Sequence, residues 1–357
     1  MNDIRQILRR FGETNPDAEA LDYIKLLYQN EFGCGHLCPD GADVLSFLTE
    51  EWDNIGHFPH TPLFDDIGNG LCRLNLGALR KSDLPLAARA FVLSAQTPRG
   101  SDSSFREKLL LLDQMVQNSQ LPLNGRQAAS VIKDYLAGGI RPIHHSESFR
   151  ERHAPHYRVV ELPFAVFFPV LQEAQNLLEA GEKPIFAIDG RCASGKTSLA
   201  ALLRAFFPCN VFHMDDFFLP FDLRTEDRLS APGGNVHYER FFSEVLIPIC
   251  SGQPFSYQPF CCKDGSFGSS IQVAPRPLSV VEGAYSMHPA LRRYYGQSVF
   301  LTVSPEIQQS RILARNGKET LRMFNERWIP LEERYFAELQ IPGVCSEVID
   351  TSLLDQD

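Results

Sequence analysis

The spacing of apolar residues differs between the two halves of the chain. In the first half, apolar positions recur about every 3.6 residues, which predicts amphipathic helices. These helices are expected over residues 17–30, 86–95, 104–118 and 125–136. Residues 1–140 are therefore predicted to form a mainly helical domain. The pattern itself suggests no role for this domain.

From residue 163 onward, short apolar runs alternate with helical segments. A helix is expected over 164–180, and it leads into the apolar run Pro184-Ile-Phe-Ala-Ile-Asp189. Further strands are expected over 210–214, 278–282, 298–303 and 347–349. Short apolar strands that alternate with helices are typical of a parallel sheet covered on both faces. Residues 163–357 are therefore predicted to form an α/β domain around a five-stranded, mostly parallel sheet.

A glycine-bracketed loop follows the first of these strands, and a helix starts directly after it. Gly190, Gly195, Lys196 and Thr197 occupy the four fixed positions of the P-loop pattern. The glycines allow successive N–H groups to turn inward around phosphate oxygens. The helix start adds unpaired N–H groups and a positive dipole end. Lys196 would neutralise the β- and γ-phosphates, and the Thr197 hydroxyl would coordinate Mg²⁺.

Carboxylates end two of the other predicted strands. Asp215 and Asp216 follow the second strand about 20 residues after the loop, and one of them could face the phosphates, because parallel strand ends open onto the ligand crevice. Such a carboxylate accepts the proton of a hydroxyl that is being phosphorylated. Glu282 ends the third strand, where P-loop enzymes place a carboxylate near Mg²⁺. Solvated turn residues are the alternative reading of both sites.

Two arginines, Arg311 and Arg315, are four residues apart and so share one helix face. A pair of guanidinium groups that closes over the transferred phosphate is a frequent electrostatic device. Surface ion pairs with nearby glutamates are an equally good interpretation.

Composition narrows the class of protein. The 357 residues suggest two domains, and 44% hydrophobic and 22% charged residues describe an ordinary globular protein. The net charge of −10 argues against broad binding to nucleic acid or to anionic membranes. Nine scattered cysteines and a start without a secretory signal favour reduced thiols in the cytoplasm. No apolar run approaches the length needed to span a membrane. The oligomeric state is left open.

Residues 141–162 are predicted to connect the two domains. The segment is polar and contains His144, His145, His153 and His156. A metal site is one interpretation.

A metal site is also one interpretation of Cys34, His36 and Cys38 upstream. Neither this spacing nor that of the four histidines matches the paired ligands of zinc sites. A hydrogen-bonding loop or an inter-domain contact is another interpretation. A third is an anion pocket of His144, Arg150, Arg152 and Arg158 that faces the nucleotide site.

Taken together, the motifs of the second half resemble the uridine kinase-type branch of P-loop kinases, which includes phosphoribulokinase, pantothenate kinase and nicotinamide riboside kinase. The resemblance covers about residues 163–350. It rests on Asp189-Gly-Arg-Cys-Ala-Ser-Gly-Lys-Thr-Ser198, on His213-Met-Asp-Asp-Phe-Phe-Leu-Pro220, on Val280-Val-Glu-Gly-Ala-Tyr285 and on the arginines before Asn316.

The resemblance implies roles for particular residues. Asp215 matches the general base, and Lys196, Arg311 and Arg315 match groups that act on the phosphate, the two arginines as part of a mobile lid. The nucleotide would be held by Gly190, Ala193, Ser194, Gly195, Lys196, Thr197 and Ser198. Thr197, Asp215 and Glu282 would lie at the metal. Asp216, Phe217, His237, Tyr238 and Tyr257 would contact the phosphate acceptor.

One segment departs from the pattern of this family. Its nucleoside kinases follow a Tyr-Asp-Phe string with a His-x-Arg pair that grips the nucleoside. Here Tyr257-Gln-Pro-Phe260 is followed by Cys261-Cys-Lys-Asp-Gly265, without that pair. A nucleoside acceptor is therefore not favoured. Residues 1–140 receive no role from the resemblance.

The resulting expectation is an ATP-dependent kinase that uses Mg²⁺ and transfers the γ-phosphate to a hydroxyl of a small metabolite. The alternative is a regulatory switch, in which the nucleotide-bound P-loop domain controls partner binding by the helical domain. A further hypothesis makes residues 1–160 a separate enzyme with His36, His144 or His145 as acid–base groups. The acceptor, and ATP against GTP, stay open.

Overall fold

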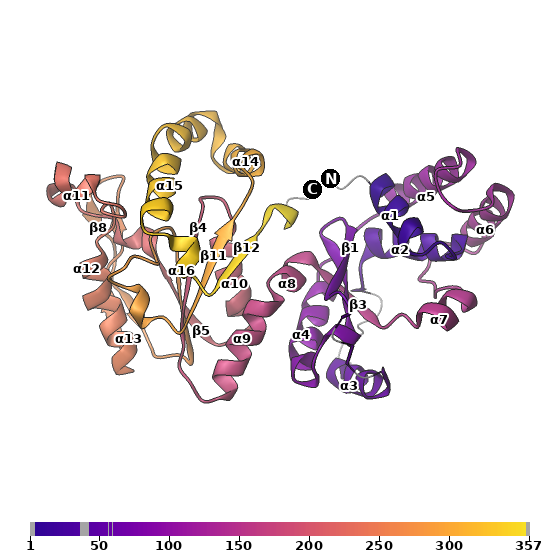
Figure 1. The fold of residues 1–357 in the computed structure, drawn as a ribbon, viewed down its shortest axis with the longest axis horizontal. Coiled ribbons are helices and arrows are strands. Elements are labelled where there is room, and N and C mark those ends of the chain that lie inside the picture. The colour runs from indigo at the N-terminus through magenta and orange to yellow at the C-terminus, as the bar shows by residue number, and fades with distance from the viewer. Residues whose placement is uncertain (1–3, 36–42, 56, 59, 355–357) are drawn as a thin grey trace. The chain divides into compact units, whose positions relative to one another are not determined.

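The computed structural model describes residues 4–35, 43–55, 57–58 and 60–354. These residues form two compact units, which are described separately (Figure 1). The first runs to Phe168 and also includes Leu354, and the second runs from Pro169 to Leu353. The domain boundary predicted after residue 162 lies shortly before this division.

The first unit is mainly helical. Its helices are α1 (Ile4–Thr14), α2 (Ala20–Phe32), α3 (Val44–Ile55), α4 (Leu84–Ala95), α5 (Asp102–Gln117), α6 (Gly125–Ala137), α7 (Glu147–His153) and α8 (Leu162–Val166). The four helices expected from the apolar spacing correspond to α2, α4, α5 and α6. Proline lies in the first turn of α4, where its missing N–H has no partner to lose. The mainly helical character predicted for this half is confirmed.

An antiparallel sheet of three strands lies among these helices and was not predicted. It consists of β1 (Phe64–Gly68), β2 (Leu71–Asn75) and β3 (Tyr157–Glu161), in the order β1-β2-β3. The strands are only five residues long, and β1 contains two aspartates, which are depleted in strands. Residues 141–162, predicted as a connecting segment, contain α7 and β3 and so belong to the first unit.

The second unit is an α/β fold. Its helices are α9 (Phe168–Glu179), α10 (Lys196–Phe206), α11 (Glu226–Ser230), α12 (Tyr238–Phe241), α13 (Ile247–Ser251), α14 (Pro305–Met323), α15 (Ile329–Glu338) and α16 (Ile341–Val344). Its main strands are β4 (Ile185–Gly190), β5 (Cys209–His213), β10 (Leu278–Glu282), β11 (Gln297–Thr302) and β12 (Glu347–Asp350). Two short antiparallel pairs accompany them: β6 (Phe255–Tyr257) with β9 (Ile271–Val273), and β7 (Phe260–Cys261) with β8 (Ser266–Phe267).

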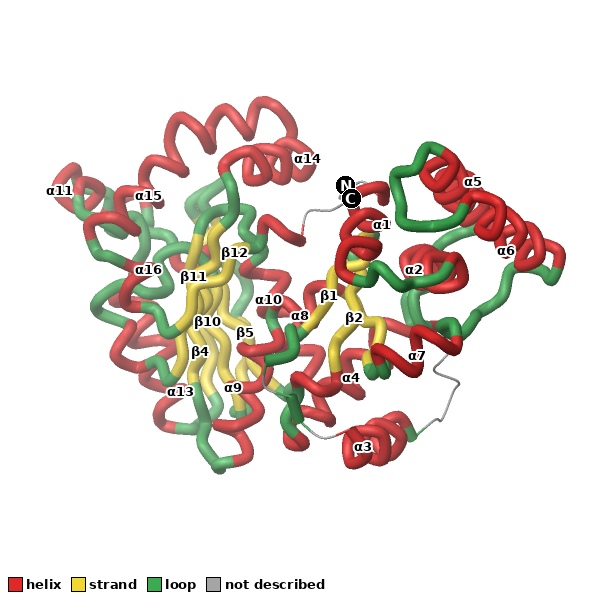
Figure 2. The backbone as a smooth tube through the Cα atoms, turned by 45° about the vertical axis from the view of Figure 1, so that its right-hand side comes forward, coloured by secondary structure: helices red, strands yellow, loops and turns green. Residues whose placement is uncertain are grey.

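The five main strands form one sheet in the order β12-β11-β4-β10-β5, and every neighbouring pair is parallel. The predicted five-stranded sheet is thus confirmed, with each strand within a residue or two of its expected place. Figure 2 shows α10 and α13 on opposite sides of this sheet. β4 lies in the middle, so the loop that follows it is flanked by the ends of β10 and β11.

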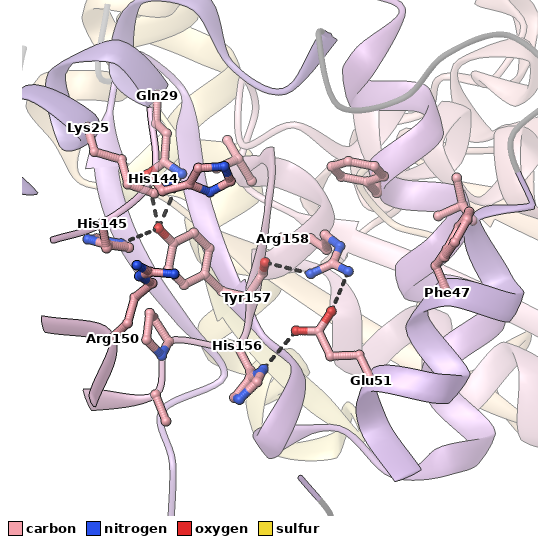
Figure 3. Close-up of a pocket in the computed structure, with 15 residues that line it drawn as sticks. Lys25, Gln29, Phe47, Glu51, His144, His145, Arg150, His156, Tyr157 and Arg158 are labelled. Atoms are coloured by element: carbon pink, nitrogen blue, oxygen red, sulfur yellow. Dashed lines mark hydrogen bonds and ion pairs between the residues drawn. The ribbon is translucent and has the colours of Figure 1, made fainter. Parts of the chain in front are cut away.

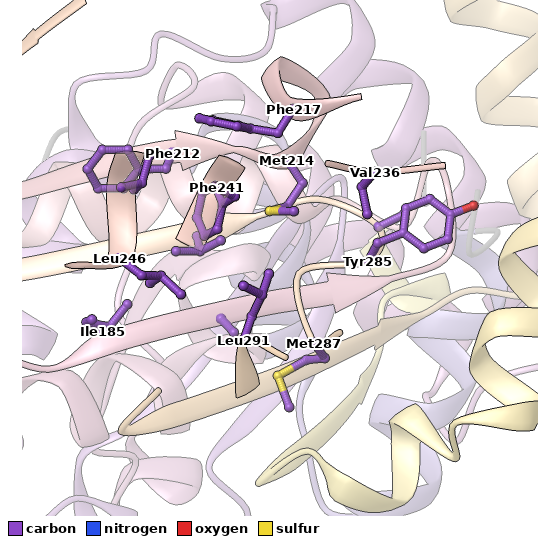
Figure 4. Close-up of a cluster of buried hydrophobic side chains, with 14 of the residues drawn as sticks. Ile185, Phe212, Met214, Phe217, Val236, Phe241, Leu246, Tyr285, Met287 and Leu291 are labelled. Carbon is purple, nitrogen blue, oxygen red and sulfur yellow. The ribbon is translucent and has the colours of Figure 1, made fainter. Parts of the chain in front are cut away.

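A cluster of buried apolar side chains packs one face of the sheet in the second unit (Figure 4). It includes Phe212 at the end of β5, Phe217 just after it and Phe241 of α12, all with at most 1% of their surface exposed. Phe217 packs edge-on against Phe241 and stacks on Tyr257. The cluster therefore fixes the chain on both sides of Asp215. Within the described part of the chain, every helix is too short or too polar to cross a bilayer.

Candidate active site

The loop between β4 and α10 has the backbone conformation that its glycines were expected to permit. Gly190 has a φ of 140°, and a Cβ placed on it would lie 2.1 Å from the carbonyl oxygen of Leu301. Gly195 has a φ of 92° and directly precedes the first turn of α10. Both conformations are open to glycine and strained for other residues. The loop therefore turns tightly against β11 before the helix begins.

The Lys196 side chain is hydrogen-bonded to the backbone of this loop. Its Nζ donates to the carbonyl oxygens of Gly190 at 2.7 Å and Arg191 at 2.8 Å. The amine thus joins the first residues of the loop to the N-terminal end of α10. A helix start with inward N–H groups and a lysine is a site for phosphate. Thr197 and Ser198 follow in the first helical turn, and both are exposed.

Asp189, the last residue before the loop, anchors it from beneath and was not singled out from the sequence. Its buried carboxylate accepts hydrogen bonds from the N–H groups of Gly190 at 2.7 Å and Met287 at 2.9 Å, and from the Tyr335 hydroxyl at 2.9 Å. Burial raises the pKa of Asp189 above its ordinary value, although these donors oppose the shift. An aspartate directly before the first loop glycine was the available sequence signal.

Helices α14 and α15 hold the outer side of the loop. The Glu332 carboxylate accepts from the Cys192 N–H at 2.9 Å, and the Gln308 amide donates to the Cys192 carbonyl at 3.0 Å. The Thr351 hydroxyl donates to the Ser194 carbonyl at 2.8 Å. Sequence reasoning missed these residues, because they come from segments more than 110 positions away along the chain.

Arg311 belongs to the same support. Its guanidinium donates to the carbonyl oxygens of Ala193 at 3.0 Å and Thr351 at 2.9 Å. This arrangement differs from the predicted mobile lid, because the side chain is bound to the outside of the loop. Arg315, one turn later on α14, is exposed, and its positive charge lowers the pKa of Asp215. Arg315 therefore acts electrostatically on Asp215, whereas Arg311 supports the loop through hydrogen bonds.

Strand register brings Glu282 and His213 together. They are direct neighbours at the ends of β10 and β5, and the His213 Nδ1 lies 2.5 Å from the Glu282 Oε1. The Thr197 hydroxyl donates to the same oxygen at 3.2 Å. The hydrogen bond to Glu282 raises the pKa of His213, so the imidazole stays protonated to higher pH. His213 was not predicted as a site residue.

Asp215 lies where these groups meet. It follows β5 in a short 3-10 turn, Met214–Phe217, and keeps an exposed surface. Burial by the surrounding protein raises its pKa, Lys196 lowers it, and Glu282 raises it. These opposing shifts arise only because the lysine and the glutamate are near Asp215. The residues predicted for the loop, the base and the metal are thus brought to one edge of the sheet.

The residues predicted to contact the acceptor have different surroundings from one another. The Tyr257 hydroxyl donates to Asp216 at 3.4 Å, and burial raises the pKa of both groups. The Phe217 side chain is fully buried in the apolar cluster, so only its backbone is free for polar contacts. Its carbonyl accepts from the His237 N–H at 2.7 Å.

This backbone contact places His237 beside the turn that carries Asp215. The His237 Nδ1 is buried and has no hydrogen-bond partner among the described residues. Tyr238 stacks on His288 at 4.0 Å, and its hydroxyl accepts from Arg228 at 3.0 Å. Tyr238 lines a cavity of about 320 Å³ together with residues of α12 and the segment 289–293.

Three of the four histidines of the predicted connecting segment have separate partners in the first unit. His145 contacts Asp22, His153 contacts Asp17, and His156 contacts Glu51. No three His, Cys, Asp or Glu side chains among the described residues are grouped to hold a metal ion. Cys34 is buried, whereas His36 and Cys38 lie outside the described residues.

Comparison with known proteins gives distant structural likenesses. The chain matches no protein-family model and no curated protein. It is similar to the structure of a possible uridine kinase from Bacillus stearothermophilus, with 16% identity over 51% of this chain and 100% of that chain and a TM-score of 0.36. It is also similar to D-glycerate 3-kinase from Cryptococcus neoformans, with 14% identity over 53% of this chain and 97% of that chain and a TM-score of 0.38. Likenesses at this level leave the activity to be inferred from the residues themselves.

Proposed function

We propose that the second unit is an ATP-dependent kinase that transfers the γ-phosphate to a hydroxyl of a small metabolite. The supporting observation is the place of Asp215 in the turn directly after β5, two residues after His213, which is paired with Glu282 at the strand ends; Lys196 and Glu282 both influence the pKa of Asp215. A phosphate-binding loop alone would serve any nucleotide-binding protein. A carboxylate base beside that loop is what phosphorylation of a hydroxyl requires.

In the proposed reaction, the loop N–H groups and the Lys196 amine hold the phosphates and neutralise the charge that spreads over the transferred group. Asp215 accepts the proton of the acceptor hydroxyl as its oxygen attacks. The raised pKa of Asp215 favours this role, because a carboxylate with a higher pKa is a stronger base. Arg315 adds positive charge on the same side.

The oxygen donors near the loop suit Mg²⁺. The Thr197 hydroxyl and a Glu282 oxygen lie 3.2 Å apart, and hard oxygen ligands are those that Mg²⁺ prefers. We expect Thr197, directly, and Glu282 and Asp215, through water, to hold the ion. When bound, Mg²⁺ supplies positive charge to the phosphate oxygens. His213, hydrogen-bonded to Glu282, orients that carboxylate.

The acceptor would lie between the Asp216–Tyr257 pair and His237, which flank the turn that carries Asp215. The His237 Nδ1 gives this region one buried nitrogen without a described partner, and Asp216 gives it an anionic oxygen. Both can bind hydroxyl groups. We therefore expect a polyhydroxylated acceptor, with ATP as donor and GTP as the alternative donor to be compared.

The test is a screen of hydroxylated metabolites with MgATP that follows ADP formation. Asp215→Asn should lower turnover on the identified acceptor by about 10²–10⁴-fold and leave ATP affinity within a few-fold. Asp222→Asn, which makes the same charge change at an exposed position seven residues later, should leave turnover nearly unchanged. Full activity of Asp215→Asn would contradict the proposed base. Tight nucleotide binding without turnover of any acceptor would favour the regulatory switch.

A further inference from the structure

A second pocket lies within the first unit and is independent of the P-loop site. Its volume is about 800 Å³, within the range of small-molecule sites, which are about 300–1,000 Å³. Its lining comes from α2, α3, α4, α7 and β3 and from the segments beside α7. In the view of Figure 3, Lys25, His144 and Arg150 gather around Tyr157, and Phe47 lies beyond Glu51.

Positive charge exceeds negative charge in this lining. The cationic groups are Lys25, Arg150 and Arg158, against the single carboxylate of Glu51. Glu51 is already neutralised, because its oxygens lie 2.6 Å from the Arg158 guanidinium and 2.8 Å from the His156 ring. The lining thus offers no second carboxylate to its other two cations.

Lys25 and Arg150 have no carboxylate within ion-pair distance among the described residues. The Lys25 amine donates to the carbonyl of Ile143, at 2.9 Å. Burial lowers the pKa of Lys25 to about 8, and the positive charge of Arg73 contributes to this shift. Arg73 lies behind the pocket, is 6% exposed and binds the Gln29 side-chain oxygen instead of an acid. An anion at this position would relieve the repulsion.

A hydrogen-bonded chain holds the polar wall rigid. Asp22 accepts from the His145 Nδ1 at 2.8 Å, and the His145 Nε2 lies 2.8 Å from the Tyr157 hydroxyl. The Gln29 amide donates to the same hydroxyl at 3.2 Å, and Arg73 holds the other end of that amide. Preformed polar groups of this kind bind a ligand with little loss of side-chain freedom.

The opposite wall is apolar. Val44 and Phe47 come from α3, and Phe91 comes from α4. Phe47 is 63% exposed, an unusual state for a large aromatic side chain that lines a pocket. A ligand that covered this ring would bury apolar surface, which is favourable.

We propose that this pocket binds a small organic anion. Its phosphate or carboxylate would lie between Lys25, His144 and Arg150, and its apolar body would lie against Phe47 and Phe91. The site is distinct from the proposed kinase site, and its existence does not depend on kinase activity.

Isothermal titration calorimetry on the full chain tests this proposal with three probes that share a phenyl ring: phenyl phosphate, benzoate and phenol. All titrations use Lys196→Ala protein in parallel with the unchanged chain, because the P-loop also binds phosphate. At least one anion should bind in both proteins, and neutral phenol should bind at least tenfold more weakly. Comparing phenyl phosphate with benzoate tells which head group the site takes.

Two matched variants locate the binding. Arg150→Ala should weaken the bound anion about tenfold or more, the scale of one charge-assisted hydrogen bond. Arg152→Ala removes the same charge from the same helix, but this side chain does not line the pocket and pairs with Asp17, so affinity should stay within about twofold. Circular dichroism would check that both variants are folded.

Phe47→Ser should weaken the aromatic anions and leave inorganic phosphate unaffected. The proposal is overturned if neither anion binds at millimolar concentration, if phenol binds as well as they do, if binding disappears in Lys196→Ala protein, or if Arg152→Ala is as damaging as Arg150→Ala.

Discussion

Gly190 is a position where a single methyl group would collide with the backbone of a neighbouring strand. A Cβ there would lie 2.1 Å from the Leu301 carbonyl oxygen and 2.7 Å from its nitrogen, and the φ of 140° is itself strained for other residues. We expect Gly190→Ala to lower the free energy of unfolding by at least about 3 kcal/mol and to abolish nucleotide binding.

Gly343 provides the matched control, because a Cβ added there would meet no atom within 4 Å outside its immediate neighbours. Gly343→Ala should be close to neutral. Urea unfolding and titration with MgATP measure both effects. Normal nucleotide affinity in Gly190→Ala protein would mean that the loop tolerates a different path.

His145 makes the first unit sensitive to acid. Burial lowers its pKa from 6.5 to about 4, although the hydrogen bond to Asp22 opposes this shift. The unfolded chain therefore binds the proton first, so stability is fully present above pH 6.5 and falls as the pH drops toward 4. The shift corresponds to about 3 kcal/mol.

Urea unfolding at pH 7 and pH 4.5 measures this loss. The chain has two tryptophans, and Trp328→Phe leaves Trp52 of α3 as a fluorescence probe of the first unit. His145→Gln should flatten the pH dependence, whatever its effect on stability at pH 7. An unchanged slope in that variant would assign the acid sensitivity to other groups.

At the level of elements, α14 contributes to the site by supporting it. Arg311 on this helix binds the carbonyl oxygens of the loop and of Thr351, so its removal should loosen the loop without removing a phosphate ligand. We expect Arg311→Ala to weaken MgATP binding about tenfold, the effect of one or two hydrogen bonds to a charged group.

Arg322→Ala on the same helix removes an exposed pair with Glu326 and should leave affinity unchanged. Fluorescent-nucleotide titration compares the two variants. If Arg311→Ala lowered turnover at saturating ATP and left affinity unchanged, the lid role implied by the resemblance would be the better account.

The elements that the sequence predicted well are those that repeat a strong local signal. β4, β5, β10, β11 and β12 are short apolar runs between helices, and each was recognised by that alternation. β1 and β2 were not predicted, because Asp65, Asp66 and Arg73 interrupt their apolar pattern. The pairing of β2 with β3 joins residues more than 80 positions apart, such as Arg73 and Val159, which no local pattern records.

The candidate site also contains both residues that the sequence predicted and residues that it did not. Lys196, Thr197, Asp215 and Glu282 were predicted because each sits in a recognisable motif or at a strand end. Their supporting partners were not, since Glu332, Gln308 and Thr351 gain meaning only when the folded chain brings them to the loop. Phe217 looked like an acceptor contact because of its place in a motif, whereas its side chain is part of the apolar cluster.

At the scale of the whole molecule, each unit has its own sheet and its own buried apolar residues. A unit with these properties is expected to fold alone. A fragment that begins at Phe168 keeps the whole of α9 and should bind MgATP within about twofold of the full chain.

The complementary fragment, ending at residue 167, should retain helical circular dichroism and a cooperative thermal transition. Calorimetry of both fragments and of the full chain provides the measurement. Loss of nucleotide affinity in the fragment from Phe168 would show that the first unit is needed for the P-loop site.

The thiol of Cys192 lies inside the proposed nucleotide loop, between the backbone groups held by Glu332 and Gln308. It is buried, and burial raises its pKa to about 12, with the nearby Glu332 charge adding to the shift. At physiological pH this sulfur is therefore almost entirely protonated, and a protonated thiol reacts slowly with peroxides and alkylating agents. A cysteine in a nucleotide-binding loop is a candidate redox switch, but the Cys192 thiol has low reactivity. Oxidants would react first with exposed cysteines such as Cys250 and Cys262.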